Sequence, residues 1–170
     1  MTDLIIREAR PEDRDAIRDV TLAAYGEYAA ELPPPFWEAY RENILATLAD
    51  IEGASQFVAE RANAIAGTVL LYPPRTLSSA EHQISVAMPW PEVRLLAVAP
   101  EARGHGIGAA LMDECVRRTR AAGTGVLSLH TTDFMRAALR MYERMGFVRA
   151  PELDFEPAPG MTIKGYRLDL

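Results

Sequence analysis

The sequence predicts a mixed α/β fold, with a central mixed β-sheet of about seven strands and helices on both faces. One observation is that short apolar runs of strand length alternate along the chain with longer segments of helical periodicity. A second is that residues 92–131 read as strand, glycine turn, helix and strand, which is the pattern of a crossover between two parallel strands. The length of 170 residues is typical of one domain, so we expect residues 1–170 to fold as a single domain.

The N-terminal part predicts one strand and two helices. Leu4-Ile5-Ile6 reads as a strand, and Pro11 suits the first position of a helix whose positive end Glu12 and Asp13 would stabilise. Three prolines within Glu31–Pro35 end that helix. A second helix follows, with an apolar stripe of Phe36, Trp37, Tyr40, Ile44 and Leu48. These aromatic residues suit either the core or a substrate cleft.

A hairpin and a long connection come next. Ser55–Glu60 and Ala64–Tyr72 read as two strands joined by a short turn. Pro73–Pro91 reads as a long connection, with a short strand at Gln83–Met88 inside it. Connections of this length usually carry function or lack regular structure.

A glycine turn between a strand and a helix is the most informative feature. Val93–Val98 is an apolar run of strand length, and Pro100 ends it because proline has no N–H for a ladder. Arg103-Gly104-His105-Gly106-Ile107-Gly108 then enters an amphipathic helix expected from Ile107 to Ala122. The first amides of a helix lack internal partners, and glycine lets the backbone approach a phosphate closely. The sequence therefore predicts a phosphate-binding turn.

The C-terminal part completes the sheet. Val126–His130 reads as a buried strand, and a helix is expected from Met135 to Met145. Phe147–Arg149 and Met161–Leu168 are the last two strands. The single cysteine, Cys115, falls on a core-facing helix position, which is typical of a buried structural thiol.

Composition excludes several classes of protein. There are 18 basic and 24 acidic residues, giving a net charge of −6, whereas a nucleic-acid surface is usually basic. No apolar segment has the length of a membrane span, and the N-terminus does not resemble a signal peptide, so a cytoplasmic protein is expected. We see no spacing typical of metal ligands and no catalytic triad. Monomer and homodimer both remain open.

Two nucleotide motifs were compared with the glycine turn. A P-loop needs Lys and Ser or Thr after its last glycine, but Ala109 and Ala110 follow Gly108 here. The dinucleotide pattern G-x-G-x-x-G/A is met by Gly104, Gly106 and Ala109. Its expected acidic residue has only a poor candidate in Asp133, and too little chain follows to complete a dinucleotide domain.

A third pattern fits better. Arg103, Gly106 and Gly108 fill the fixed positions of R/Q-x-x-G-x-G/A, and Tyr142-Glu143-Arg144-Met145-Gly146-Phe147 matches a second signature, Tyr-Glu-x-x-Gly-Phe. Together they resemble the GNAT superfamily of acyl-CoA-dependent N-acetyltransferases. The resemblance is sharp over residues 92–149. It implies two parallel central strands that splay apart, and acetyl-CoA as the acyl donor.

The resemblance also implies which residues bind the donor. In the family, the glycine turn holds the CoA pyrophosphate and the central strand bonds the pantetheine arm. Relatives often have an asparagine where Met135 stands, which weakens one contact with CoA. The implied donor-binding residues are Ala97, Val98, Arg103, Gly104, His105, Gly106, Ile107, Gly108, Ala109, Met135 and Ala138.

Tyr142 and Glu92 are the implied catalytic residues. A phenol such as that of Tyr142 can protonate the leaving thiolate, although a tyrosine here also suits the core. Glu92 matches a position where many relatives carry a glutamate base. His130, at the end of the next strand, and water are alternative routes for the amine proton.

The resemblance implies an N-acetyltransferase that moves an acetyl group from acetyl-CoA to a primary amine of a small molecule or peptide. The amine would attack directly, through a tetrahedral intermediate. A non-catalytic acyl-CoA-binding module on the same fold is an alternative. A dinucleotide-dependent oxidoreductase is a second one, since the glycine pattern is nominally met.

Overall fold

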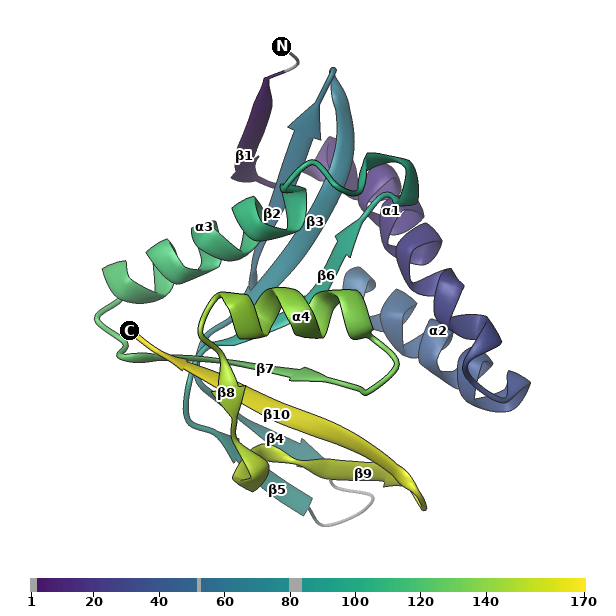
Figure 1. The fold of residues 1–170 in the computed structure, drawn as a ribbon, viewed down its shortest axis with the longest axis vertical. Coiled ribbons are helices and arrows are strands. Elements are labelled where there is room, and N and C mark those ends of the chain that lie inside the picture. Colours follow the sequence, from purple (N-terminus) through teal and green to yellow (C-terminus); the bar gives the residue numbers. More distant parts are fainter. Residues whose placement is uncertain (1–2, 52, 80–83) are drawn as a thin grey trace. The chain divides into compact units, whose positions relative to one another are not determined.

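The computed structural model describes residues 3–51, 53–79 and 84–170 (Figure 1). The chain divides into two compact units. The first comprises Met1–Leu70 and Leu95–Cys115, and the second comprises Leu71–Arg94 and Val116–Leu170. Three elements, β3, β6 and α3, contribute residues to both units.

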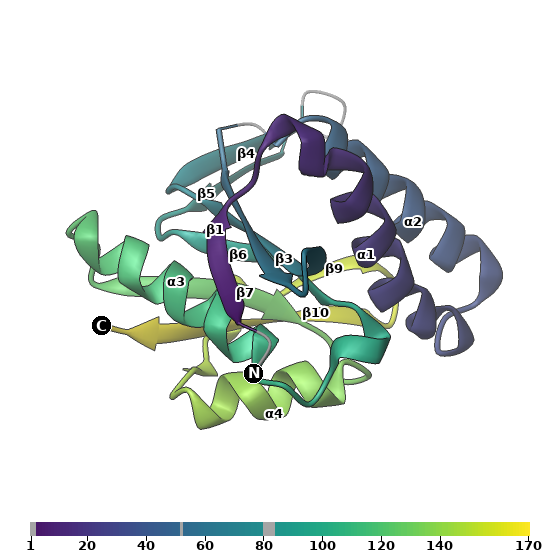
Figure 2. The same ribbon diagram turned by 90° about the horizontal axis from the view of Figure 1, so that it is seen from above.

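The first unit holds the N-terminal strands and helices. Its elements are β1 (Leu4–Glu8), η1 (Pro11–Asp13), α1 (Arg14–Gly26), η2 (Glu27–Ala30), α2 (Pro34–Ala49), β2 (Ser55–Arg61), most of β3 (Ala64–Tyr72), the end of β6 (Glu92–Val98), η3 (Pro100–Ala102) and the start of α3 (Ile107–Ala121). Its strand order is β1-β2-β3-β6, and β1 pairs with β2 antiparallel. Figure 2 shows α1 and α2 running side by side.

Close packing in the first unit depends on one glycine. A Cβ on Gly67, in β3, would lie 2.8 Å from Ile107 Cγ2 and 3.0 Å from both the Ala97 carbonyl oxygen and Leu111 Cδ1. Real Cβ contacts are longer than this, so only glycine lets β3, β6 and α3 approach so closely. Ile107 and Leu111 are fully buried, which anchors the first turn of α3.

The second unit contains the parallel strand pair. Its further elements are β4 (Arg75–Ser79), β5 (Ile84–Met88), β7 (Val126–Thr131), α4 (Arg136–Arg144), β8 (Val148–Arg149), η4 (Pro151–Leu153), β9 (Phe155–Ala158) and β10 (Met161–Asp169). Its strand order is β6-β7-β10-β8, with β9 on β10, and β4 and β5 form a separate two-stranded sheet. β6 and β7 are parallel, with Glu92 opposite Ser128, whereas β10 pairs antiparallel with β7, β8 and β9.

The mixed α/β fold and the parallel crossover over residues 92–131 are thus confirmed. The expectation for residues 73–91 was partly wrong, because most of this connection is the β4–β5 hairpin. The strand expected at Gln83–Met88 is present as Ile84–Met88, while Gln83 lies outside the described residues. The connection 151–160 also contains η4 and β9, which pairs with β10 although it includes Pro157.

Cys115 is buried as expected. Its side chain is inaccessible, and burial raises the pKa of the thiol to about 12, so it stays protonated at neutral pH. Among the helices of the described residues, none combines the length and the apolar character needed to cross a bilayer.

Candidate active site

The glycine turn has the backbone geometry of an anion site. Gly104 and Gly106 have φ values of 78° and 74°, which favour glycine, and no atom lies within 4 Å of the position of either Cβ. The bond from the Ala110 amide to the Gly106 carbonyl, at 3.0 Å, closes the first turn of α3. The amides of Ile107, Gly108 and Ala109 therefore precede the helical ladder, at the positive end of the helix.

Two side chains of the turn have fixed contacts. Arg103 donates from Nη1 to Glu27 Oε2 at 2.5 Å, and both side chains are about half exposed. His105 Nδ1 lies 2.9 Å from the Arg103 carbonyl oxygen and 3.2 Å from that of Ala102. Since carbonyl oxygens only accept, Nδ1 carries the proton, and the ring of His105 is held against its own turn.

The strand before the turn has an irregularity. Leu95, within β6, has a φ of 49°, an uncommon left-handed conformation for a branched residue. This conformation departs from the regular backbone of a strand. Leu95 lies two residues before Ala97, which is buried, and three before Val98, which is half-buried. Nothing in the local sequence distinguishes Leu95 from the apolar residues around it.

Glu92 is the centre of a buried charge cluster in the second unit. Only 4% of the residue is exposed. Its Oε2 accepts a hydrogen bond from Arg75 Nη2 at 2.6 Å, and its Oε1 lies 2.8 Å from His130 Nδ1. The two strands β6 and β7, paired in parallel, bring Glu92 and His130 together, whereas Arg75 comes from β4.

The imidazole of His130 lies between two acceptors. Its Nε2 is 2.9 Å from the Leu153 carbonyl oxygen, so Nε2 carries a proton and donates it. An ionised carboxylate also only accepts, so Nδ1 donates to Glu92 whenever Glu92 is ionised. Both ring nitrogens of His130 thus face acceptor oxygens. Phe155 packs on it edge to face, with ring centroids 5.3 Å apart.

The cluster keeps Glu92 ionised. Burial alone would raise the pKa of this carboxyl. The hydrogen bond from His130 and the charges of His130, Arg75 and Arg94 outweigh burial, and the pKa lies below its usual value. Glu92 is therefore a carboxylate with both oxygens engaged, and a weaker base than an ordinary glutamate.

Helix α4 carries the other candidate residues. Met135, at its N-cap, and Ala138 are half-buried, and Tyr142 is buried with 6% of its surface exposed. These positions, three and four residues apart, share one helix face. The Tyr142 ring lies 5.8 Å from that of Phe147, so the Tyr-Glu-x-x-Gly-Phe signature is also a packing unit. Met135 Sδ accepts a weak hydrogen bond from Thr131 Oγ1 at 3.7 Å.

Several contacting groups were missed by the sequence analysis. Arg75 begins β4 and the Leu153 carbonyl belongs to η4, and neither element was anticipated. Glu27, the partner of Arg103, is 76 residues away in the chain. None of these groups has a local pattern that reveals its partner.

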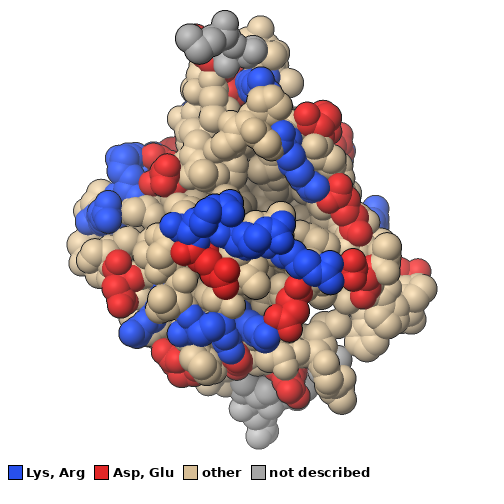
Figure 3. Space-filling model, viewed as in Figure 1, with Lys and Arg blue, Asp and Glu red and all other residues tan. Residues whose placement is uncertain are grey.

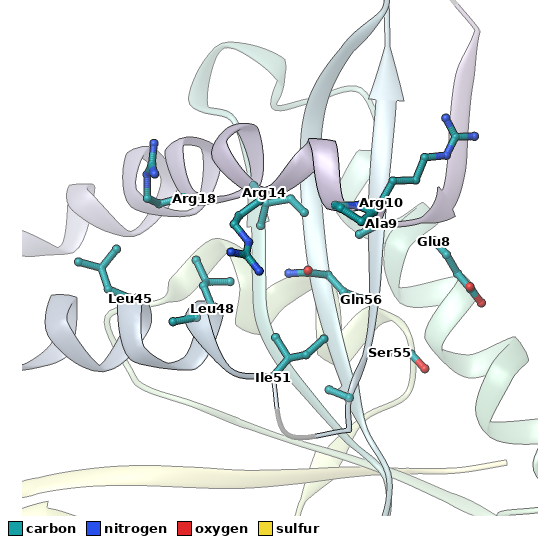
Figure 4. A pocket seen from close by; sticks show the side chains of 14 residues that line it. Glu8, Ala9, Arg10, Arg14, Arg18, Leu45, Leu48, Ile51, Ser55 and Gln56 are labelled. Carbon is teal, nitrogen blue, oxygen red and sulfur yellow. The ribbon is translucent and has the colours of Figure 1, made fainter.

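The first unit also has a groove that contains none of the predicted site residues (Figure 4). Its volume is about 640 Å³, and it is lined by the start of α1, the end of α2 and the segment leading into β2. Figure 4 shows Arg14 and Gln56 pointing into it and Arg18 pointing away. The floor is apolar, with Leu45, Leu48 and Ile51 among its lining residues.

Charges are unevenly spread despite the net charge of −6. Figure 3 shows a row of basic side chains over α4, which carries exposed arginines at 136, 140 and 144. Their spacing of four residues places them on one helix face. No group of three His, Cys, Asp or Glu side chains suited to a metal ion gathers within the described part of the chain.

The chain is similar to known acetyltransferases in sequence. The model of the acetyltransferase (GNAT) family matches residues 15–147, which is most of the chain. A mycothiol acetyltransferase of Thermobispora bispora is 33% identical over 96 residues, which is 56% of this chain and 30% of that protein. A mycothiol acetyltransferase of Propionibacterium freudenreichii is 34% identical over 68 residues, which is 39% of this chain and 22% of that protein. The chain thus spans less than a third of the length of these relatives.

Solved structures show the same fold. A GCN5-related N-acetyltransferase from Rhodopseudomonas palustris has a TM-score of 0.76 at 18% identity, covering 100% of this chain and 98% of the other. A GNAT family acetyltransferase from Brucella melitensis in complex with acetyl-CoA has a TM-score of 0.64 at 24% identity, covering 99% of this chain and 88% of the other. These likenesses show the fold, and the family match over residues 15–147 establishes that the chain belongs to the GNAT family of acetyltransferases.

Proposed function

We propose that this chain is an N-acetyltransferase that transfers an acetyl group from acetyl-CoA to a primary amine of a small molecule or peptide. The observation that carries the proposal is the glycine turn at the start of α3, in a chain that matches the GNAT family. Its left-handed glycines and leading amides suit a pyrophosphate. We further propose that residues 1–170 act together as one acetyltransferase domain.

The donor is held by backbone and by one permanent charge. We propose that the amides of Gly104 to Ala109 bind the pyrophosphate and that Arg103 supplies a positive charge. The backbone of Ala97 and Val98 would bond the pantetheine arm, and an N–H there could stabilise the oxyanion that forms on attack. Other expected contacts are with His105, Met135 and Ala138.

Tyr142 is the proposed acid. When the amine has attacked the thioester carbonyl, the carbon–sulfur bond breaks and the departing thiolate needs a proton, which the phenol can give. Tyr142 is buried on α4 and packs on Phe147, so its ring is held in place. A phenol attracts a nearby anion more strongly in a buried place than in water, because the buried surroundings are less polar.

Glu92 and its partners are the proposed destination of the amine proton. Both carboxylate oxygens already accept hydrogen bonds, and the pKa of Glu92 is lowered. We therefore propose a water that passes the proton to Glu92, rather than direct contact. His130 and water alone are the alternative routes for this proton.

Binding and turnover together test the proposal. A ligand that binds only the native state raises the melting temperature, so acetyl-CoA should raise it and NAD(P)H should not. Release of CoA in the presence of a panel of amines, with an equal amount of N-acetylated product, is the expected catalytic result. Binding of acetyl-CoA without transfer to any amine would favour the non-catalytic alternative.

A further inference from the structure

Arg75 has one buried group that no described residue satisfies. Its Nη2 donates to Glu92 at 2.6 Å, but its Nη1 is buried and has no hydrogen-bond partner within the described residues. A guanidinium is always charged, and a buried donor left without an acceptor is costly. We propose, building on the acetyltransferase function above, that Arg75 binds a carboxylate of the acceptor, which is therefore a small amino acid.

The guanidinium is held in position before any acceptor arrives. Its central carbon lies 3.9 Å from the centroid of the Tyr72 ring, so the guanidinium is in cation–π contact with that ring. The hydrogen bond to Glu92 also fixes how the planar guanidinium is turned within its plane. Two contacts of this kind orient Nη1 in one direction, and a preorganised guanidinium loses less freedom when it binds a planar carboxylate.

The charge of the cluster also favours an anion. Among the described residues, Glu92 is the one carboxylate paired with Arg75 and His130. Arg94 adds a further positive charge, with its guanidinium carbon 5.8 Å from the same Tyr72 ring. Asp154, which interacts electrostatically with His130, pairs instead with Arg149. A second carboxylate would balance the excess of positive charge.

The distances limit the kind of acceptor. Nη1 and the Glu92 carboxylate are joined through one guanidinium, and Glu92 is the proposed destination of the amine proton. An acceptor that reaches both has its amine and its carboxylate only a few bonds apart, as in an α- or β-amino acid. The N-terminus of a peptide has its α-carboxylate tied up in a peptide bond, and only a first-residue Asp offers a side-chain carboxylate at that distance, so the cluster favours the small-molecule class.

The hairpin that carries Arg75 can give access to it. β4 and β5 form a two-stranded sheet of their own, separate from the main sheet. Within the described residues, no strand pairing therefore ties the hairpin to the main sheet. A small movement of the hairpin that keeps the Arg75–Glu92 bond would uncover Nη1 and leave the Glu92–His130 pair unchanged.

Matched acceptors test the inference. Acetyl transfer is measured with each of the twenty L-amino acids and with their primary amides, which keep the amine and lack the carboxylate. We expect the accepted amino acids to have kcat/KM values roughly tenfold or more above those of their amides, as for a hydrogen bond to a charged group. Arg75→Gln should remove this preference mainly by raising KM for the amino acids. Arg75→Lys should restore part of it.

Arg120→Gln, an exposed arginine of α3, is the matched control for loss of one charge and should keep the preference. Equal use of amino acids and amides by the wild type would overturn the inference, as would an equal loss for both with Arg75→Gln.

If no amine is acetylated, the proposed function fails, and binding of the amino acids and of their amides is then compared directly. With CoA present, the amino acids should raise the melting temperature of the wild type but not of Arg75→Gln. Equal shifts of the wild-type melting temperature by amino acids and by amides would overturn the inference about Arg75.

Discussion

Arg103 of the glycine turn and Glu27 of η2 form an ion pair, with Nη1 2.5 Å from Oε2. Arg103 is the arginine that we propose binds the pyrophosphate. The carboxylate of Glu27 competes with the phosphate for this arginine and also repels the phosphate. Glu27 therefore lowers affinity for acetyl-CoA in this account. Both side chains are about half exposed, so we expect Glu27 to change the free energy of acetyl-CoA binding by no more than about 1 kcal/mol.

Glu27→Gln should strengthen acetyl-CoA binding by up to about fivefold, since it removes the competing charge. Isothermal titration at low and high salt measures this, and the gain should shrink as salt screens the charges. Glu31→Gln, the same substitution four residues later on an exposed side chain, should have little effect. Weaker binding by Glu27→Gln would mean instead that Glu27 positions Arg103 for phosphate.

Gly106→Asp should abolish acetyl-CoA binding. It places a side chain and a negative charge where phosphate is expected to approach, at a φ of 74°. Gly123→Asp is a matched control, because Gly123 has a φ of 73° but lies after the other end of α3. The control should show the same backbone strain and unchanged binding, and full affinity in Gly106→Asp with an intact fold would remove the site from this turn.

Tyr142→Phe should lower turnover by roughly 10²–10⁴, the usual range for loss of a general acid. Acetyl-CoA affinity should change far less, because the pyrophosphate is bound by the glycine turn in our proposal. The ring is retained, so packing on Phe147 should survive within about 1.5 kcal/mol. Steady-state kinetics combined with titration separates the two effects, and near-normal turnover would leave Tyr142 a core residue.

Glu92→Gln should slow turnover most at low pH, where the acceptor amine most needs help in losing its proton. The lowered pKa means that Glu92 contributes folding stability above its ordinary value of 4.5, and that this is lost as the pH falls through the lowered value. Rates compared from about pH 6 to 9 thus avoid acid unfolding. A pH–rate profile unchanged by the substitution would assign the proton to His130 or to water alone.

Gly165→Ala should destabilise the fold by about 1–3 kcal/mol. A Cβ at Gly165 would lie 2.4 Å from Leu153 Cβ and 2.8 Å from the Ala150 carbonyl oxygen, so η4 has to move. The Leu153 carbonyl that holds His130 moves with it. Gly125→Ala is the control, because no atom lies within 4 Å of its Cβ position. Denaturant unfolding of both variants measures the difference, and equal stability would contradict this packing.

Local signals predicted the elements that hold the proposed donor site. The apolar run before Pro100, the glycines of the turn and the periodicity after Ile107 each act on neighbouring residues, and the observed β6, η3 and α3 follow them closely. The buried Cys115 followed from the same periodicity. Helix α4 likewise begins one residue after the predicted start.

Long-range contacts account for what the sequence could not predict. The bond between Arg75 and Glu92 joins residues 17 apart, and that between His130 and Leu153 joins residues 23 apart. Both depend on how β4, β6, β7 and η4 pack together. The positive φ of Leu95 has no local signal either, since a leucine in an apolar run predicts regular strand.

Acetyl transfer itself is the most direct test of the central claim. The purified protein is incubated with acetyl-CoA and the panel of amines, and free CoA and N-acetylated product are measured together. We predict equal amounts of both for at least one amine, and neither with Gly106→Asp. Release of CoA without an acetylated amine, or binding of acetyl-CoA with no transfer to any member of the panel, would contradict the account.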